Sequence, residues 1–244
     1  MSVGTEPVAL KPLSRAMTLN WSEKRVQWLG AILLATVAGY VDGYGLLFLK
    51  TYVSFMSGNT TSTGVTSGQG NFHAAFLSAL AIISFVIGSF QGNLLSQLRW
   101  RHCHRMMFSL ISAGFAMVTG LEWAGVRNVP LEVALLGVTM GMVNPALSKV
   151  GVEAVSLTFM TGTLSRIGSH LAMAAGQQPL SDRQGREDSH LALAGIDASV
   201  WFGFLGGAVL SGLAGSNFRA SALLPPCIVI LVLGMVSECA APSP

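Results

Sequence analysis

Long apolar runs separated by short polar segments dominate the chain from residue 28 onward. Each run approaches the roughly 20 residues that a helix needs to cross the hydrocarbon core of a bilayer. Runs such as AIISFVIGSF at 81–90 do not alternate, so they do not fit the strands of a transmembrane barrel. The pattern predicts six membrane-spanning helices, at residues 28–49, 72–94, 106–123, 131–150, 196–215 and 220–237.

The composition points to the same surroundings. Only 10% of the residues are charged and the mean hydropathy is +0.58, whereas an ordinary globular chain is about a quarter charged. The net charge is +3 and the basic residues are scattered, which does not indicate nucleic-acid binding. The 3 cysteines are too few and too irregularly spaced for a disulfide framework or a zinc site. We therefore expect a lipid bilayer as partner, and no nucleic acid, metal or cofactor.

The basic residues predict an orientation, because Lys and Arg gather on the cytoplasmic side of short loops. Of the 14 basic residues, only Lys50, Arg127 and Arg219 fall on the other side of the six predicted spans. We therefore expect both termini in the cytoplasm and the protein in the plasma (inner) membrane. The expected parts are a cytoplasmic segment at 1–27, three-helix units at 28–126 and 127–238, a cytoplasmic loop at about 169–195, and a tail at 239–244.

Two passages in the two halves resemble each other. GYVD at 39–42 precedes SFMSGNTTSTG at 54–64, and GMVN at 141–144 precedes TFMTGTLSRIG at 158–168. Three spans per half is an odd number, so a duplicated second half must be inverted in the membrane. The sequence thus predicts an all-α 3+3 inverted repeat with broken first and fourth helices, a plan that secondary transporters often have. The alternative is that the duplication reflects gene history alone.

The same passages carry a family resemblance. GYVDGYGLLFLKTYVSFMSGNTTSTG, with the later GMVNPALSKVG and TFMTGTLSRIG, resembles the YoaK-like family of small membrane proteins, a domain family of unknown function. The resemblance spans nearly all of residues 28–237 and implies a six-span protein, without a substrate, reaction or catalytic residue. The chain departs from the usual pattern in having Pro145 after Asn144 and an extended polar loop at 177–190.

Asp42 is the strongest candidate for a functional residue. An ionisable group inside a span costs at least about 2.5 kcal/mol on the most lenient insertion scale. Flanking glycines would let the backbone open around a proton or cation, and Asn144 is the counterpart of Asp42 in the second passage. Pro145 favours a break in the fourth span. The alternative is structural, with Asp42 capping a broken helix or bonding Asn144 or Tyr44 across the repeat interface.

The segment at 57–71 has no charge and too little hydrophobicity for a lipid-facing helix. We expect non-helical backbone there that faces water or protein and offers amide and hydroxyl groups to a solute. A solvated loop that caps the next span is the alternative. The candidate binding residues are therefore Asp42, Tyr44, Gly58, Asn59, Thr60, Asn144, Thr161 and Gly162, with Gln91, Asn93, Lys149 and Glu153 as secondary candidates.

Several polar residues also have structural interpretations. Gln91 and Asn93 could hydrogen-bond between helices, and Lys149 with Glu153 could form an i,i+4 ion pair. An amphipathic surface helix at 164–175 would explain Arg166 and His170, and we expect Glu122 to be interfacial. Small residues every four positions in the fifth span indicate tight packing, including a homodimer, and these residues are Gly203, Gly207, Ser211 and Gly215.

These expectations lead to two functional hypotheses. The first is a small secondary transporter or channel for a small polar solute or ion, coupled to protons through Asp42 because protonation neutralises a carboxylate. The second is a non-transporting membrane scaffold, receptor or accessory subunit. We do not expect an enzyme, since the sequence contains no pattern of catalytic residues at a workable spacing.

Overall fold

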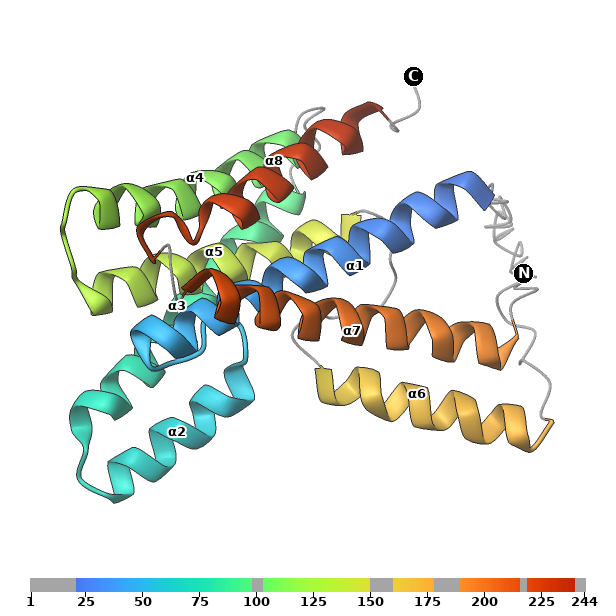
Figure 1. Ribbon diagram of the computed structural model, residues 1–244, viewed down its shortest axis with the longest axis horizontal. Helices are drawn as coiled ribbons and strands as arrows, with labels where there is room; N and C mark the ends of the chain where they lie inside the picture. Colours follow the sequence, from blue (N-terminus) through green and yellow to red (C-terminus); the bar gives the residue numbers. More distant parts are fainter. Residues whose placement is uncertain (1–20, 98–102, 150–159, 178–188, 216–218, 240–244) are drawn as a thin grey trace, which may run out of the picture.

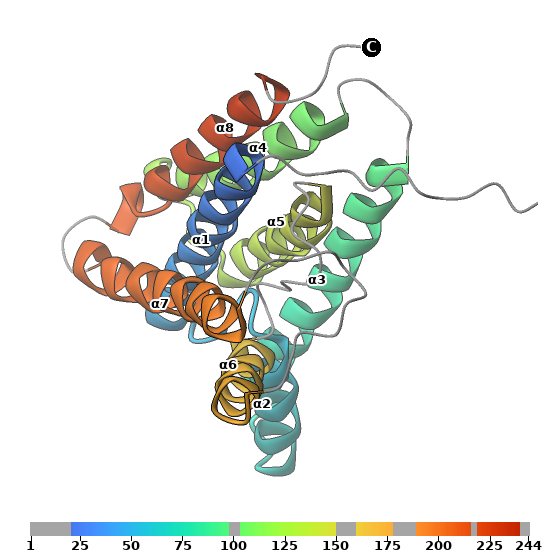
Figure 2. The same cartoon turned by 90° about the vertical axis from the view of Figure 1, so that its right-hand side faces the viewer.

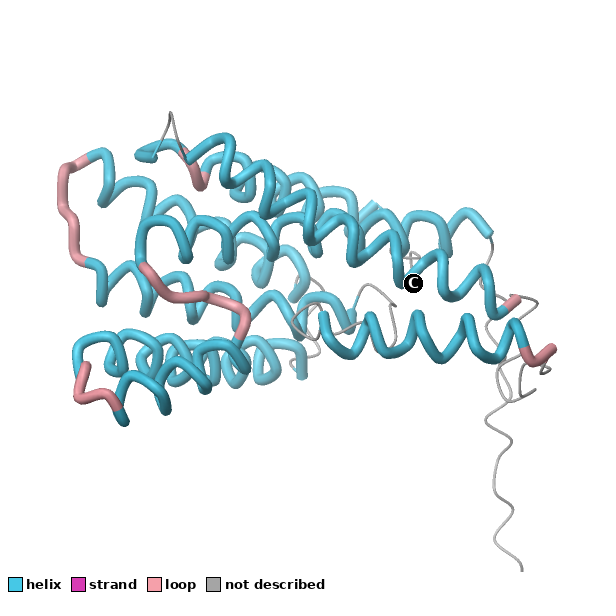
Figure 3. The backbone as a smooth tube through the Cα atoms, turned by 60° about the horizontal axis from the view of Figure 1, so that its bottom comes forward, coloured by secondary structure: helices cyan, strands magenta, loops and turns pink. Residues whose placement is uncertain are grey.

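A computed structural model describes residues 21–97, 103–149, 160–177, 189–215 and 219–239. Apart from short loops, this part of the chain is helical, which confirms the predicted all-α class (Figure 3). The elements are α1 (Trp21–Tyr44), the π-helix η1 (Gly45–Leu49), α2 (Met56–Gly68), α3 (Phe72–Gln97), α4 (Cys103–Trp123), α5 (Val129–Lys149), α6 (Met160–Ala175), α7 (His190–Gly215), the short 3-10 helix η2 (Arg219–Ser221) and α8 (Leu224–Cys239).

Five of the helical stretches are long and apolar enough to cross a membrane: Trp28–Leu49, Phe72–Gln97, Arg105–Trp123, Val129–Ala146 and His190–Gly215. They match the first five predicted spans. The sixth predicted span corresponds to α8, whose apolar stretch Leu224–Met235 is shorter. Large apolar side chains such as Ile83, Phe90 and Phe202 are exposed on the outside of the bundle, as contact with lipid requires.

The long helices pack in pairs drawn from the two halves of the chain. α1 lies against α7, α3 against α5, and α4 against α8. The start of α1 and the end of α8 lie toward the same end of the bundle (Figure 1). The chain therefore has the path expected if both of its termini lie on one side of a membrane.

The two short helices, α2 and α6, lie end to end along one edge of the bundle (Figures 1 and 2). Each begins near the middle of the bundle and runs toward the opposite end from the other, packed on α3 and α7 respectively. With 13 and 16 residues they are about 20 and 24 Å long, less than the roughly 30 Å of a hydrocarbon core. Neither is long enough to cross a membrane upright.

Backbone contacts at glycine bring the paired helices together. A methyl group at Gly39 of α1 would overlap the carbonyl oxygen of Phe204 in α7, and one at Gly207 would overlap that of Thr36. Small residues permit this close approach, which stabilises helix pairs in lipid. The small-residue stripe of α7 therefore packs on α1 within the chain. It no longer supports the predicted homodimer.

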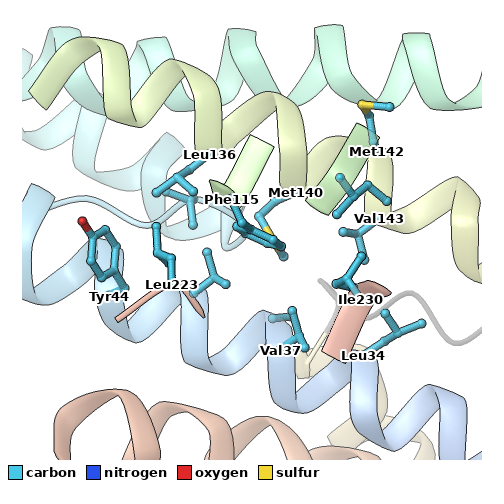
Figure 4. Close-up of a cluster of buried hydrophobic side chains, with 14 of the residues drawn as sticks. Leu34, Val37, Tyr44, Phe115, Leu136, Met140, Met142, Val143, Leu223 and Ile230 are labelled. Atoms are coloured by element: carbon cyan, nitrogen blue, oxygen red, sulfur yellow. The ribbon is translucent and has the colours of Figure 1, made fainter. Parts of the chain in front are cut away.

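Buried apolar side chains fill the space between α1, α4, α5 and α8 (Figure 4). Since lipid tails are as apolar as these side chains, close packing rather than exclusion from water holds the core together. Members of this core at 1% exposure or less include Leu34, Tyr44, Phe115, Leu136, Met140, Val143 and Ile230.

The predicted helix breaks at Asp42 and Asn144 are wrong. α1 stays helical through Asp42 to Tyr44, then widens into η1 and ends at Lys50, whose φ of 57° is left-handed. α5 continues through Asn144 and Pro145 to Lys149. A proline removes a single backbone hydrogen bond from a helix, and Gly92 of α3 leaves room for the Pro145 ring.

The expectation of non-helical backbone at 57–71 is also wrong, because α2 covers most of this segment. Thr60 and Thr63 donate their hydroxyl hydrogens to carbonyl oxygens one turn earlier, those of Met56 and Asn59, both at 2.8 Å. These bonds satisfy the hydroxyls without disrupting the helix. The alternative, a solvated loop with a Ser/Thr cap, is not found either, since Asn71 caps the next span with its Oδ1 accepting from the Ala74 backbone at 3.3 Å.

Candidate functional site

Asp42 holds the loop that joins η1 to α2. Its Oδ1 accepts hydrogen bonds from the backbone nitrogens of Val53 (2.9 Å) and Ser54 (2.7 Å), and its Oδ2 accepts from Ser54 Oγ at 2.6 Å. The residue is only 4% exposed. Bonds of this kind to an ionised acceptor are strong, and they satisfy a buried carboxylate that would otherwise be very costly. Asp42 thus bonds its own loop, and neither Asn144 nor Tyr44.

Asn59 holds the same loop from the other side. Its Oδ1 accepts from Thr51 Oγ1 at 3.0 Å and from the Tyr52 backbone at 3.2 Å, and its Nδ2 donates to the Tyr52 carbonyl at 2.7 Å. It is the buried residue of α2. Asp42 and Asn59 together fix both halves of the segment at 50–55, and we call this pair the loop clamp.

The other predicted binding residues of the first half lie around the loop clamp without joining it. Gly58 packs beneath the Phe55 ring, where a side chain would collide. Thr60 is exposed and bonds within its own helix. Tyr44 is fully buried farther along α1, with its ring 5.0 Å from that of Phe48.

The predicted residues of the second half lie on two elements. Asn144 is half-buried in α5. Thr161 is exposed and Gly162 half-buried in the first turn of α6. The structure therefore brings Asp42 and Asn59 together around one loop, whereas the second-half candidates belong to α5 and α6 and take no part in this loop's hydrogen bonds.

Two of the secondary candidates lie in the described part of the chain with their side chains. Gln91 and Asn93 are exposed on α3, and Asn93 Nδ2 donates to the Ser89 carbonyl of the same helix at 2.8 Å. Lys149 is the last residue of α5, and its side chain lies outside the described part. Glu153 is outside the described residues, so the predicted ion pair with Lys149 stays a prediction.

Polar contacts join α6 to α7. Arg166 forms an ion pair with Asp197, which is 5% exposed, and His170 Nδ1 lies 3.1 Å from His190 Nδ1. The predicted helix at 164–175 is confirmed as part of α6, although these contacts hold it against α7. Asp197 was not among the predicted candidates.

A second group of charges lies where α1, α4, α5 and η2 meet. Arg219 Nε is 3.0 Å from Glu122 Oε1, and its guanidinium lies 4.8 Å from the centre of the Phe48 ring. Glu132, in the first turn of α5, is fully buried. Electrostatic interactions connect Glu132 with Glu122, Arg219 and Tyr44. We call Tyr44, Glu122, Glu132 and Arg219 the Glu132 cluster.

Sequence reasoning missed most of this cluster. Glu122, expected at the interface, is 7% exposed and lies inside the bundle. Glu132, Glu122 and Asp197 each lie second or second-last in a predicted span, so the criterion that selected Asp42, an ionisable group well inside a span, did not select them. Their partners could not be predicted either, since the contacts come from helices far apart along the chain.

Comparisons with known proteins agree on the class of molecule. The sequence model of a family described as "Protein of unknown function (DUF1275)" matches residues 30–236. The chain is similar to "UPF0700 transmembrane protein RA0705" of Rhizobium meliloti, with 29% identity over 215 residues that cover 86% of this chain and 87% of that protein. It is also similar to "UPF0700 transmembrane protein YoaK" of Bacillus subtilis, with 26% identity over 141 residues, 55% of this chain and 63% of that protein. No solved structure matches.

Proposed function

The chain belongs to the DUF1275 family, and from this premise we propose that it is a small six-span transporter or channel for a polar solute or ion. It is an integral membrane protein of the UPF0700, YoaK-like kind, and the family description assigns it no function. One observation carries the proposal. Two half-length helices, α2 and α6, begin at mid-bundle and point their N-terminal ends toward each other (Figures 1 and 2).

A membrane protein needs a physical reason to begin helices in the middle of the bundle. Non-helical backbone at membrane depth is tolerated only where protein covers it or where it lines a water-filled cavity. The loop clamp meets the first condition for the segment at 50–55, since Thr51, Val53 and Ser54 are 4% exposed or less. Carriers use interrupted helices of this kind near the midplane to present backbone groups to a solute.

We propose that the two halves form an inverted repeat. The close contacts between paired helices recur in both halves. Corresponding residues of α1 and α5 differ by one constant number of positions, and corresponding residues of α7 and α3 differ by another. The contact of Gly39 with Phe204 has its counterpart in Gly141 with Phe85, and that of Thr36 with Gly207 in Val138 with Gly88. This recurrence supports a duplication, and an odd number of spans per half makes the copies inverted.

The short helices follow the same correspondence. Asn59 is the buried residue of α2, and Thr163, its equivalent in the aligned passages, is the buried residue of α6. At the next turn, Ser62 hydrogen-bonds Ser78 of α3 at 3.0 Å, where the second half pairs Arg166 with Asp197. The second half thus has an ion pair where the first has two hydroxyls.

We propose that solute passes between the facing ends of α2 and α6. The N-cap residue of α2, Phe55, makes no side-chain capping bond, and Met56 N donates to the Ser54 carbonyl at 3.1 Å, which leaves the next amides of the first turn as donors for the solute. Ser57 and Thr161, near these two ends, are exposed. Asp42 then acts by positioning the loop that sets the start of α2, and no catalytic step is involved.

The proposal is tested in proteoliposomes by light scattering after osmotic shock with glycerol, urea or potassium chloride. We expect faster entry of at least one of these probes than in protein-free vesicles. Ser57→Trp and Thr161→Trp should abolish the difference because the added indole would obstruct the proposed path at the helix ends. Ser67→Trp, at the far end of α2, is the matched control and should retain it.

Entry rates equal to those of empty vesicles for all three probes, or equal in the tryptophan variants and the wild type, would contradict the proposed path. The scaffold, receptor or accessory-subunit hypothesis would then be preferred. Its structural support is Asp42, whose hydrogen bonds within its own chain leave it no need of a solute.

A further inference from the structure

Glu132 is a buried acid that the proposed function does not use. It lies in the first turn of α5 and is 0% exposed. Neither carboxyl oxygen makes a hydrogen bond within the described part of the chain. An isolated ionised carboxylate in such surroundings is very unfavourable, and the group becomes neutral instead.

Charged and titratable groups from three other elements and one loop interact with Glu132. Glu122 lies on α4, Tyr44 on α1, Arg219 on η2 and Arg127 in the loop before α5. Arg219 forms an ion pair with Glu122, and Arg127 is exposed. Arg219 is therefore already paired with Glu122, and Glu132 makes no ion pair of its own among the described residues.

A bound metal ion does not fit this site. The cluster offers two carboxylates and one phenol, whereas a hard cation such as Ca²⁺ takes six to eight oxygen ligands. Arg219 would also repel a second cation. Within the described residues, no group of three or more acidic, histidine or cysteine side chains could hold a metal ion. A proton needs only one oxygen and removes the charge.

We propose that Glu132 is a proton-binding site, protonated in the arrangement seen here. Arg219 and Arg127 both favour the ionised form, and Arg219 is the one of them that is bound to an acid of the cluster, Glu122. On release, the proton goes to water and Glu132 becomes a carboxylate, which these two cations stabilise. The site does not rest on the proposed solute path, because proton binding is measured without transport.

Infrared spectroscopy of the full-length purified protein tests the site directly. We expect a carbonyl stretching band of a protonated carboxylic acid at neutral pH. Glu132→Gln should remove it, and because glutamine has the shape of the protonated acid, this variant should fold. Asp197→Asn is the matched control and should keep the band, since Asp197 is a buried acid with a bound arginine.

Two results would overturn the assignment. One is a wild-type spectrum at neutral pH without any band of a protonated carboxyl, which needs no variant. The other is a folded Glu132→Gln protein whose band is unchanged from the wild type. Thermal unfolding gives an independent readout, in which wild-type stability should fall as rising pH removes the proton while that of Glu132→Gln changes less.

Discussion

Asp42 accepts three hydrogen bonds from one loop, and this explains how a carboxylate persists inside a helix that crosses a membrane. Water is replaced by two backbone amides and a hydroxyl fixed in position. The residue therefore links the end of α1 to the start of α2. Its two oxygens organise the backbone, which differs from a role in which the carboxyl group faces a solute.

Substitutions at Asp42 should separate these roles. Asp42→Ala leaves three buried donors without an acceptor, and at about 1–3 kcal/mol for each it should lose at least about 3 kcal/mol of stability. Asp42→Asn should lose less because its carbonyl still accepts from Val53 and Ser54. Ser54→Ala removes one bond and should cost about 1.5–3 kcal/mol. Thermal unfolding in detergent gives the order, and an Asp42→Ala protein as stable as the wild type would refute the loop clamp.

The sequence identified Asp42 and Asn59 as unusual but not what they contact. An acid among apolar residues is visible in any single chain, whereas the hydrogen bonds depend on how the loop at 50–55 folds back. Glu132 shows the same limit more strongly. It stands second in the predicted span 131–150, where an acid is unremarkable, and its burial against other elements follows only from the fold.

Among the elements, the helix pairs depend on glycines that allow backbone contact. Length and apolar character were enough to predict the long helices, since these are properties of each segment alone. The helical state of α2 was not predictable in this way, because its polar composition is typical of a loop. It is stabilised as a helix by packing on α3, and its threonine hydroxyls find acceptors within the helix.

Adjacent glycines in α7 provide a controlled test of this packing. Gly207→Ala would force a methyl group into the backbone of α1, and overpacking of this kind costs about 1–3 kcal/mol. Gly206→Ala meets no atom within 4 Å and should be neutral or slightly stabilising. The melting temperatures of the two variants test whether α1 and α7 are in backbone contact at Gly207. Equal effects would show that α1 and α7 do not pack as described.

The seam between α6 and α7 should depend on its ion pair. Arg166→Ala should destabilise more than Arg166→Ala with Asp197→Ala, since the single variant leaves a buried carboxylate without its cation. We expect a coupling of only about 0.5–1 kcal/mol, because Arg166 is 37% exposed and solvent screens it. A double-mutant cycle in thermal unfolding measures this coupling, and additive effects would argue against the pair.

For the whole molecule, the paired contacts and the opposed short helices support the proposed inverted repeat, whose two halves would meet along α1, α7, α3 and α5. The sequence predicted the repeat from passages such as GYVD and GMVN. It did not predict that each half contains a short helix starting at mid-depth, because the direction of a half-length helix depends on the neighbours it packs on.

The central claim is that α2 and α6 run from the middle of the membrane to opposite sides. Single cysteines at Ser67 and Ala175, both exposed in the last turns of these helices, test it in intact cells. With Cys103, Cys227 and Cys239 replaced, a membrane-impermeant maleimide should label Ser67→Cys from outside and Ala175→Cys only after permeabilisation. Labelling of both positions from the same side would contradict the inverted architecture and the solute path proposed on it.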